Sequence, residues 1–97
     1  MKILAISKDS AVIDWSAWQK LLEKEARTVY ELQIKGYIRE IYFTESRNAV
    51  LILEAESLKK AKELVLTLPL VKEGLIDFDL SELNPYDGFS RIFKKDF

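Results

Sequence analysis

The sequence predicts one domain of the α+β class, in which strands and helices follow the order β-α-β-β-α-β. The chain has 97 residues, which is enough for a single domain only. Two segments place apolar residues at the spacing of an amphipathic helix, and shorter apolar segments lie around them as strands do. Two of these strands are apolar without alternation, which is typical of strands covered on both faces.

The first half of the predicted domain is a strand followed by a long helix. Residues Ile3–Ile6 form an unbroken apolar strand. After a polar segment, Asp14 or Ser16 can cap the helix by accepting hydrogen bonds from its first backbone N–H groups. The helix runs to about Lys35, where Gly36 can adopt the left-handed conformation that ends a helix. Its apolar stripe consists of Trp18, Leu21, Leu22, Ala26, Val29 and Leu32.

A hairpin and a second helix follow. The strands of the hairpin cover Tyr37–Thr44 and Ala49–Leu53, and the second of them is again apolar throughout. Asn48, in the polar turn between them, is suited to a positive φ angle. Ser57 can then cap a helix over Leu58–Leu68.

A fourth strand completes the predicted domain. Pro69 prevents the second helix from continuing, and Gly74 opens a strand in which apolar and acidic residues alternate. Right-handed crossovers then give a four-stranded antiparallel sheet with both helices on one face, which is the ferredoxin-like arrangement. The two unbroken apolar strands lie in its centre.

The central strands carry apolar side chains on both faces of the sheet. Leu4 and Ile6 point opposite to Ile3 and Ala5, and the third strand has the same pattern. Because the helices cover one face only, the other face needs a cover of its own. We therefore expect a homodimer, or an oligomer built from dimers.

We expect the domain to span residues 1–83 and a C-terminal apolar tail to span residues 84–97. The tail can pack on its own domain or on a second copy, and the sequence leaves both possibilities open. Its large apolar residues are Tyr86, Phe89, Ile92, Phe93 and Phe97.

Composition excludes several classes of function. The net charge is −1, whereas proteins that bind nucleic acid need an excess of Lys and Arg. The charge run Lys59–Glu63 fits a solvated helix face. The chain lacks histidine and cysteine, so we expect no metal and no cofactor. No apolar run is long enough for a bilayer, and Ile3–Ile6 is too short for a signal peptide, so we expect a cytoplasmic protein without a membrane partner.

One carboxylate falls on the apolar stripe of the first helix. At about 100° per residue, Glu25 projects between Val29 and Leu32. Burying an ionised carboxylate without a partner is costly, so Glu25 is a candidate catalytic acid or base whose pKa is raised by burial. The alternatives are an ion pair with a strand arginine such as Arg39, or a carboxylate that reaches water.

Other side chains are candidates for contacts to a small-molecule ligand. Arg39 can bind an anionic group through two hydrogen bonds. Tyr30, Tyr37 and Tyr42 carry hydroxyl groups, and Trp18 can form a pocket wall. Glu40 is expected to share a strand face with Ile38 and Tyr42. Each of these residues has an alternative role in packing or on the surface.

Residues 25–36, followed by Arg39, resemble the exit of the first helix in muconolactone isomerases. Those proteins show a similar Glu, a Glu-Leu-Gln, a Gly, and then an Arg in the second strand. Residues 49–57 and 66–70 resemble the third strand, the start of the second helix and the Leu-Pro exit of the same family. The resemblance covers about residues 20–80.

The resemblance implies a dimeric α+β barrel, in which two ferredoxin-like sheets face each other, with a pocket between sheet and helices. Family enzymes shift a double bond in a lactone by moving a proton, without metal or cofactor, and Glu25 matches their helix-one glutamate. The strand-two position that is His in these enzymes is Glu40 here, and the neighbouring Trp positions are Ile38 and Tyr42. These departures imply a substrate other than muconolactone.

We therefore expect a small-molecule-binding protein or a cofactor-independent enzyme that transfers a proton on a lactone- or carbonyl-type ligand. The alternative is a non-catalytic dimeric module that binds a metabolite or assembles. An enclosed cavity holding Glu25 and a second polar group would favour the enzyme. A filled core with an ion-paired Glu25 would favour the module.

Overall fold

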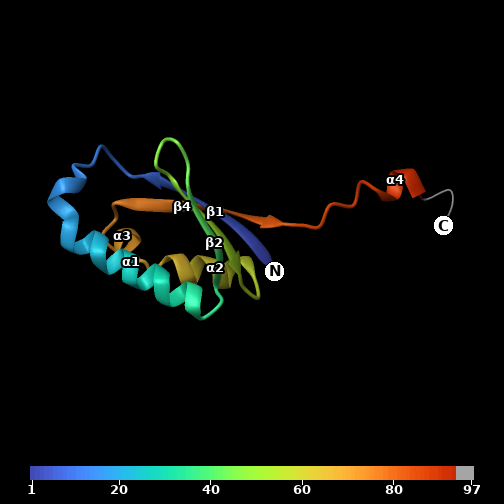
Figure 1. Ribbon diagram of the computed structural model, residues 1–97, viewed down its shortest axis with the longest axis horizontal. Helices are drawn as coiled ribbons and strands as arrows, with labels where there is room; N and C mark the ends of the chain where they lie inside the picture. Colours follow the sequence, from blue (N-terminus) through green and yellow to red (C-terminus); the bar gives the residue numbers. More distant parts are fainter. Residues whose placement is uncertain (94–97) are drawn as a thin grey trace.

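The computed structural model describes residues 1–93, which form a four-stranded sheet with helices on one side (Figure 1). The strands are β1 (Lys2–Asp9), β2 (Ile38–Phe43), β3 (Ala49–Glu54) and β4 (Ile76–Leu83). The helices are a 3-10 helix η1 (Trp15–Trp18), α1 (Gln19–Ile34), α2 (Leu58–Val65), α3 (Pro69–Lys72) and α4 (Ser90–Phe93). Within residues 1–93, none of the helices has the length and apolar character needed to cross a membrane.

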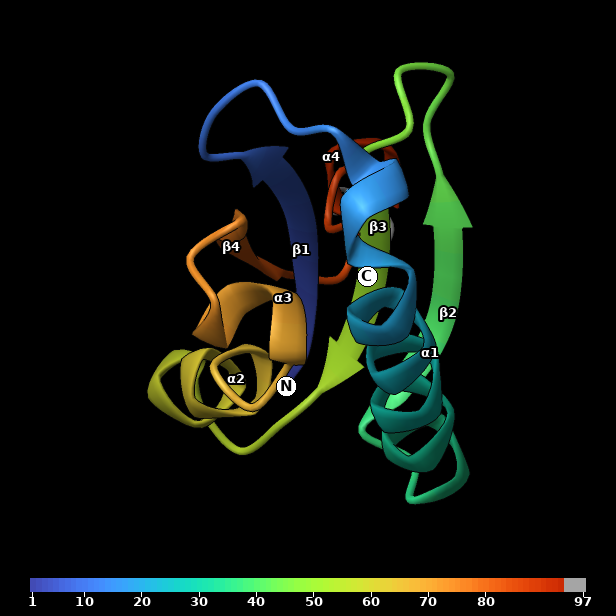
Figure 2. The same cartoon turned by 90° about the vertical axis from the view of Figure 1, so that its left-hand side faces the viewer.

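The sheet has the strand order β2-β3-β1-β4, and all neighbouring strands are antiparallel. The central strands β1 and β3 are the two with unbroken apolar sequences, as predicted. Helices α1, α2 and α3 lie together on one face of the sheet (Figure 2). The predicted fold class is therefore confirmed: an α+β domain with the ferredoxin-like element order and an antiparallel sheet.

The hydrophobic core lies between the helix layer and the sheet. Ile3 and Ala5 of β1 are fully buried there, and α2 contributes Ala61 and Val65. By contrast, no residue of α1 is fully buried, so the apolar stripe of α1 stays close to solvent. The buried apolar residues are Ile3, Ala5, Ile38, Leu51, Leu53, Ala61, Val65, Leu68, Leu70, Ile76 and Phe78.

The ends of the first helical segment follow local rules. Asp14 caps the 3-10 helix, because its carboxylate accepts from the backbone N–H of Ser16 at 3.2 Å. At the other end, Gly36 has a φ angle of 85°, which L-residues with a side chain rarely adopt. The N–H of Gly36 donates to the carbonyl of Gln33. Together these features confirm the predicted cap and the predicted glycine stop.

Helix two ends three residues earlier than predicted, and a further short helix follows it. The predicted helix extended to Leu68, whereas α2 ends at Val65. Proline disfavours the helical conformation of the residue before it, and Leu68 is accordingly extended, with a ψ angle of 130°. Pro69 then occupies the first turn of α3, where its missing N–H is harmless.

The prediction for the β2–β3 turn was wrong by one residue. Arg47, not Asn48, has the positive φ angle, which is 65°. The side chain of Asn48 is used otherwise: its Nδ2 donates to the carbonyl of Ser7 at 2.9 Å. This bond ties the turn to β1 and fixes Asn48 next to the sheet.

A register shift in β2 changes which of its residues share a face. Strict alternation would place Ile38, Glu40 and Tyr42 together, but the pairing with β3 is irregular between Ile38 and Glu40. Ile38 is buried under the helices, whereas Glu40 pairs with Ile52 on the opposite face. The predicted grouping therefore holds for Glu40 and Tyr42 only.

We call the helix-free side of the sheet the outer face. Leu4 pairs with Ile52 across β1 and β3, and Ile6 pairs with Val50. Ile6 remains 38% exposed although it lies in a central strand. Charged side chains surround this centre, including Lys8, which forms an ion pair with an acidic residue of β4. The apolar residues of the outer face are Leu4, Ile6, Val50, Ile52 and Leu83.

The end of the described chain, residues 84–93, projects away from the domain (Figure 1). We call this segment the arm. It accounts for the elongated shape, with extents of 61 × 27 × 20 Å. Its large apolar residues Tyr86, Phe89, Ile92 and Phe93 are exposed. The predicted boundary after residue 83 remains a prediction, and Phe97 lies outside the described residues.

Candidate functional site

Glu25 lies on the side of α1 that faces α3. Its Oε1 atom accepts a hydrogen bond from the backbone N–H of Leu70 at 3.0 Å, across 45 positions of sequence. The side chain is partly buried. The location therefore agrees with the sequence pattern, which placed this carboxylate on the apolar stripe.

The hydrogen bond caps α3 from a neighbouring helix. The residue at the N-cap position of α3 is Leu68, whose side chain has no acceptor, and Pro69 has no N–H to satisfy. The first N–H of α3 that needs a partner is therefore that of Leu70, and Glu25 provides the acceptor. Glu25 thus has a structural contact that joins α1 to α3.

Burial raises the pKa of Glu25 above its ordinary value, because the ionised carboxylate loses hydration in this environment. The hydrogen bond from the Leu70 N–H has the opposite and smaller effect, since it favours the ionised form. The ion pair with Arg39 is not formed: the Nε atom of Arg39 donates to the carbonyl of Gly36 at 2.8 Å instead. Within residues 1–93, Glu25 forms no ion pair that would hold its pKa down.

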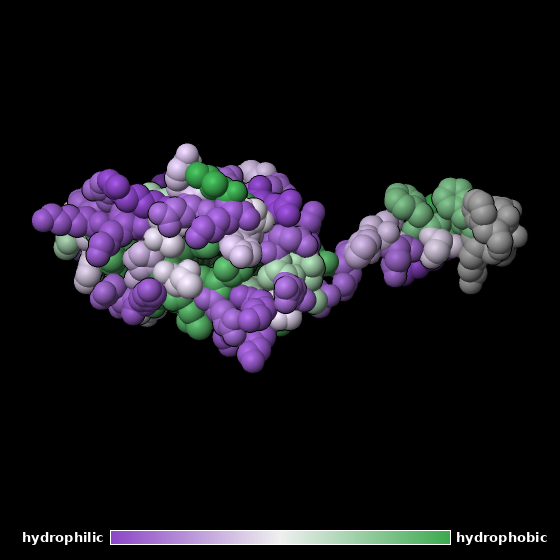
Figure 3. Space-filling view, turned by 90° about the horizontal axis from the view of Figure 1, so that it is seen from below, coloured by the Kyte–Doolittle hydropathy of each residue, from purple (hydrophilic) through white to green (hydrophobic). Residues whose placement is uncertain are grey.

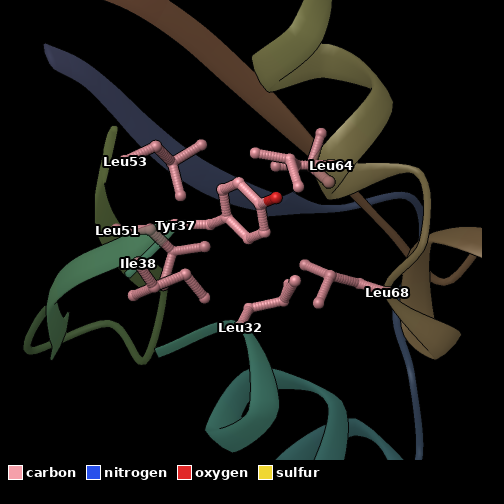
Figure 4. Close-up of a pocket in the computed structure, with 8 residues that line it drawn as sticks. Leu32, Tyr37, Ile38, Leu51, Leu53, Leu64 and Leu68 are labelled. Atoms are coloured by element: carbon pink, nitrogen blue, oxygen red, sulfur yellow. The ribbon is translucent and has the colours of Figure 1, made fainter. Parts of the chain in front are cut away.

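A narrow apolar seam lies between α1, α2 and the sheet (Figure 4). The Tyr37 ring projects into the middle of this seam, with aliphatic side chains of both helices and of β2 and β3 around it. The side chains fill the space and leave no room for a water molecule. The lining residues are Leu32, Tyr37, Ile38, Leu51, Leu53, Leu64, Val65 and Leu68.

An open groove of about 330 Å³ adjoins the seam on the solvent side. It is of the size that small ligands occupy. Tyr37 and Leu64 line both the groove and the seam, so the two spaces adjoin at these side chains. The groove also carries charge: Lys60 lines it and lies 3.5 Å from a carboxylate oxygen of Glu63. The remaining lining residues are Ala55 and Glu56.

The structure does not bring the other predicted ligand contacts to this place. Tyr42 donates a hydrogen bond from its hydroxyl to Glu40 at 2.7 Å, and this bond raises the pKa of Tyr42. Both residues lie on the outer face, opposite to the helices. Tyr30 is 64% exposed on α1, and Trp18 is partly buried at the start of the helical segment. The predicted residues therefore lie on both sides of the sheet.

Of the residues that line the groove, Tyr37 alone was predicted as a candidate for a ligand contact. Lys60 and Glu63 belong to the charge run that the sequence assigns to a solvated helix face. Tyr37, just before β2, lines the groove together with α2 and the segment that precedes it, although these parts are distant in sequence. No local signal in the sequence shows this proximity.

The architecture is that of a ferredoxin-like α+β protein with one uncovered sheet face, and it is found in solved structures. The chain superimposes on muconolactone isomerase with a TM-score of 0.74 and 16% sequence identity, covering 90% of this chain and 92% of the other. The 5-chloro-2-hydroxyhydroquinone dehydrochlorinase TftG from Burkholderia phenoliruptrix AC1100, in complex with 2,5-dihydroxybenzoquinone, gives a TM-score of 0.61 and 21% identity, covering 91% and 98%.

No protein-family model matches the sequence, and no curated protein does either. At these levels of identity, the two structures establish the fold that this chain shares with them. The resemblance to muconolactone isomerases over about residues 20–80 is thus confirmed: the chain is muconolactone isomerase-like in fold.

Proposed function

We propose that this protein binds a small organic ligand in the helix layer and transfers a proton on it, as a cofactor-independent enzyme acting on a lactone- or carbonyl-type compound. The observation that carries the proposal is Glu25, a partly buried carboxyl group with a raised pKa and no neutralising cation within residues 1–93. Such groups are frequent among general acids and bases. The fold is shared with an isomerase and a dehydrochlorinase, which supports the same class of chemistry.

The ligand would enter through the groove beside α2. Lys60 lines the groove, and an anionic group of the ligand would compete with Glu63 for its ammonium group. Rotation of the Tyr37 side chain would open the seam behind it. Leu32 of the seam lies seven residues after Glu25, which is two turns and about 10 Å along the same helix stripe. The reacting carbon would therefore lie along this stripe, between the seam and Glu25.

In the proposed step, the Glu25 carboxylate removes a proton from a carbon next to the ligand carbonyl. The electron pair of the broken C–H bond forms an enolate, and Glu25 becomes a carboxylic acid. Glu25 then returns the proton to another carbon of the conjugated system, and the double bond is shifted without net gain or loss of atoms. A raised pKa suits this role because the group must both accept and release a proton.

The proposal is tested by proton exchange in D₂O. The protein is incubated with a set of lactones, muconolactone among them, and NMR follows the incorporation of deuterium at carbons next to the carbonyl. We expect the wild-type protein to accelerate exchange for at least one lactone, and Glu25→Gln to abolish this acceleration. Unchanged exchange in the Glu25→Gln variant would remove Glu25 from the mechanism.

Glu25→Gln removes the ionisable group and keeps the hydrogen-bond acceptor. The glutamine side chain keeps a carbonyl oxygen that can accept from the Leu70 N–H, so the cap on α3 is retained. Glu31→Gln, at an exposed position of the same helix, is the matched control for the change in net charge and should leave exchange unaffected.

A second candidate function is a non-catalytic module that binds a metabolite or assembles. The capping bond from the Leu70 N–H favours it, because this bond gives Glu25 a purely structural reason to be there. The seam also favours it, since it is filled by its own side chains and Glu25 is not among the residues that line it. The two candidates differ in one result: a module would bind ligands in the groove without accelerating exchange.

We further propose that the protein is a homodimer in which two outer faces meet. The supporting observation is the apolar centre of the outer face, where Ile6 and Leu83 are each 38% exposed. A second copy of the same face is complementary to it in size and hydrophobicity. The arrangement implied by the resemblance, a dimeric α+β barrel, has this geometry.

A further inference from the structure

We propose that the arm, residues 84–93, docks on a second copy of this chain, so that two protomers exchange their arms. The arm takes no part in the groove, the seam or Glu25, but its docking on a second copy rests on the proposed outer-face homodimer. In this proposal, the apolar side chains of the arm are buried against the partner protomer.

The arm is placed apart from its own domain. It continues from the end of β4 and leads away from the helix layer (Figure 1). Figure 3 shows apolar side chains gathered on the arm, separated from those of the domain. Tyr86, Phe89 and Ile92 are 73%, 63% and 65% exposed. Exposure of large apolar groups on this scale is typical of an interaction surface.

The arm is also locally ordered, which a solvated tail would not need to be. The rings of Tyr86 and Phe89 meet edge to face, with centroids 5.0 Å apart. Gly88 is buried beneath the Tyr86 ring, and a Cβ atom at this position would overlap the ring and its hydroxyl. The N–H and hydroxyl of Ser90 both donate to the carbonyl of Asp87. These contacts order residues 86–90, which we call the apolar knob of the arm, before the arm meets a partner. Such prior order lowers the entropic cost of docking.

The sequence at the root of the arm directs it outward. Asn84 precedes Pro85, so its backbone is restricted to extended conformations. Pro85 has no N–H and cannot continue the hydrogen-bonded ladder of β4. A tight reversal onto the same sheet is therefore disfavoured at the point where the chain leaves the domain.

The second copy is favoured as the occupant because the arm is continuous with the outer face. Leu83, the last residue of β4, pairs with Lys2 and belongs to the apolar residues of that face. The next large apolar residue is Tyr86, in the arm. If outer faces meet in a dimer, each arm starts at the edge of the contact and extends beyond its own protomer. By the two-fold symmetry of such a pair, each protomer then receives the arm of the other.

The test uses paramagnetic relaxation in mixed samples of the full chain. The sequence contains no cysteine, so Arg91→Cys gives a single site for a nitroxide label on the arm. Spin-labelled protein without isotope is mixed with ¹⁵N-labelled wild-type protein, so that any broadening in the spectrum arises between two chains. We expect broadening of domain resonances in this sample. The matched control carries the label at Val12→Cys, a fully exposed apolar position in the loop after β1, and should give no such footprint.

The reverse sample distinguishes docking of the arm on the partner protomer from packing of the arm on its own domain. Here label and isotope are on the same chain, diluted tenfold with unlabelled wild-type protein. Broadening of domain resonances only in this sample would overturn the proposal, because the arm would then lie on its own domain. Broadening in neither sample would also overturn it, and would leave another protein or a membrane as the cover for the arm.

A second measurement addresses affinity. Phe89→Ser removes one large apolar side chain from the knob and should weaken self-association by at least about fivefold in sedimentation equilibrium, as expected for an interface anchor. Val12→Ser is the matched control and should not change it. Unchanged association in Phe89→Ser would contradict the proposal. Two results together would reject the docking of the arm but not the outer-face dimer. These are a Phe89→Ser variant that remains dimeric, and broadening seen only when label and isotope are on the same chain.

Discussion

Glu25 combines a structural contact with an electrostatic cost at a single residue. Its carboxylate accepts from the Leu70 N–H, which stabilises the ionised form, while burial disfavours that form more strongly. The net result is a raised pKa, so the group holds its proton more tightly in the folded than in the unfolded state. Its cap on α3 and its raised pKa, on which the proposed proton transfer rests, thus arise from the same placement on α1.

The raised pKa predicts a pH dependence of stability. Because the folded state binds the proton more tightly, the stabilising contribution of protonated Glu25 is present below the ordinary pKa of 4.5 and is lost as the pH rises through the folded value. Glu25→Gln has no such proton to lose. We therefore expect the free energy of unfolding of Glu25→Gln, relative to wild type, to increase between about pH 4 and about pH 7.

Urea denaturation at both pH values measures this difference. Glu31→Gln corrects for the change in net charge. A relative stability that decreases over this interval would show that the capping bond outweighs burial, and would reverse the direction assigned to the pKa.

At the scale of elements, α3 depends on α1 for its first hydrogen bond. The chain reaches α3 through Leu68 and Pro69, neither of which supplies a side-chain acceptor. Short helices gain little stability from their own backbone, so this acceptor from α1 matters for the attachment of α3. Since α3 leads directly into β4, its attachment also helps to position an edge strand.

Removal of the acceptor predicts a local opening at α3. Glu25→Ala leaves the Leu70 N–H without its partner and should lower the free energy of unfolding by about 1–2 kcal/mol. Hydrogen exchange should show faster exchange at the Leu70 amide in Glu25→Ala. At about pH 4, where Glu25 is largely protonated, Glu25→Gln should stay close to wild type in both measurements, since its amide oxygen can replace the carboxyl oxygen. Equal loss in the two variants would show that the charge, and not the cap, stabilises α3.

At the scale of the whole molecule, the sheet has one covered and one uncovered face. The covered face carries Ile3 and Ala5, and the outer face carries Leu4 and Ile6 on the same strand. Within residues 1–93, helices α1, α2 and α3 cover one face of the sheet, and no helix covers the other (Figures 1 and 2). We therefore expect the outer face and the arm to be the surfaces that contact a second copy of the chain.

The outer-face dimer predicts sensitivity to charge at its centre. Ile6→Asp places a carboxylate where two apolar faces would meet, and burying it without a partner is costly. We expect wild-type protein to be a dimer at micromolar concentration by light scattering and Ile6→Asp to be monomeric but folded. Val12→Asp, at a fully exposed position, is the control and should remain dimeric. A monomeric wild-type protein would contradict the argument from the central strands.

The order of elements and the position of the strands could be read from the sequence alone. The unbroken apolar runs of β1 and β3 require cover on both faces, and only central strands have it. Glycine at position 36 and proline at position 69 mark the ends of helices through their own backbone chemistry, which is local. The stripe position of Glu25 was also local, because helical periodicity depends on neighbours within a few turns.

Only the tertiary structure decided what these residues contact. The partner of Glu25 is 45 positions away, and the register shift in β2 moves Glu40 and Tyr42 to the face opposite the helices. The groove beside Tyr37 exists because this residue, just before β2, lies near residues of α2 in space. Sequence periodicity fixes which side of an element a residue occupies. The pairing of distant elements is decided by packing, and packing determines which polar groups become neighbours.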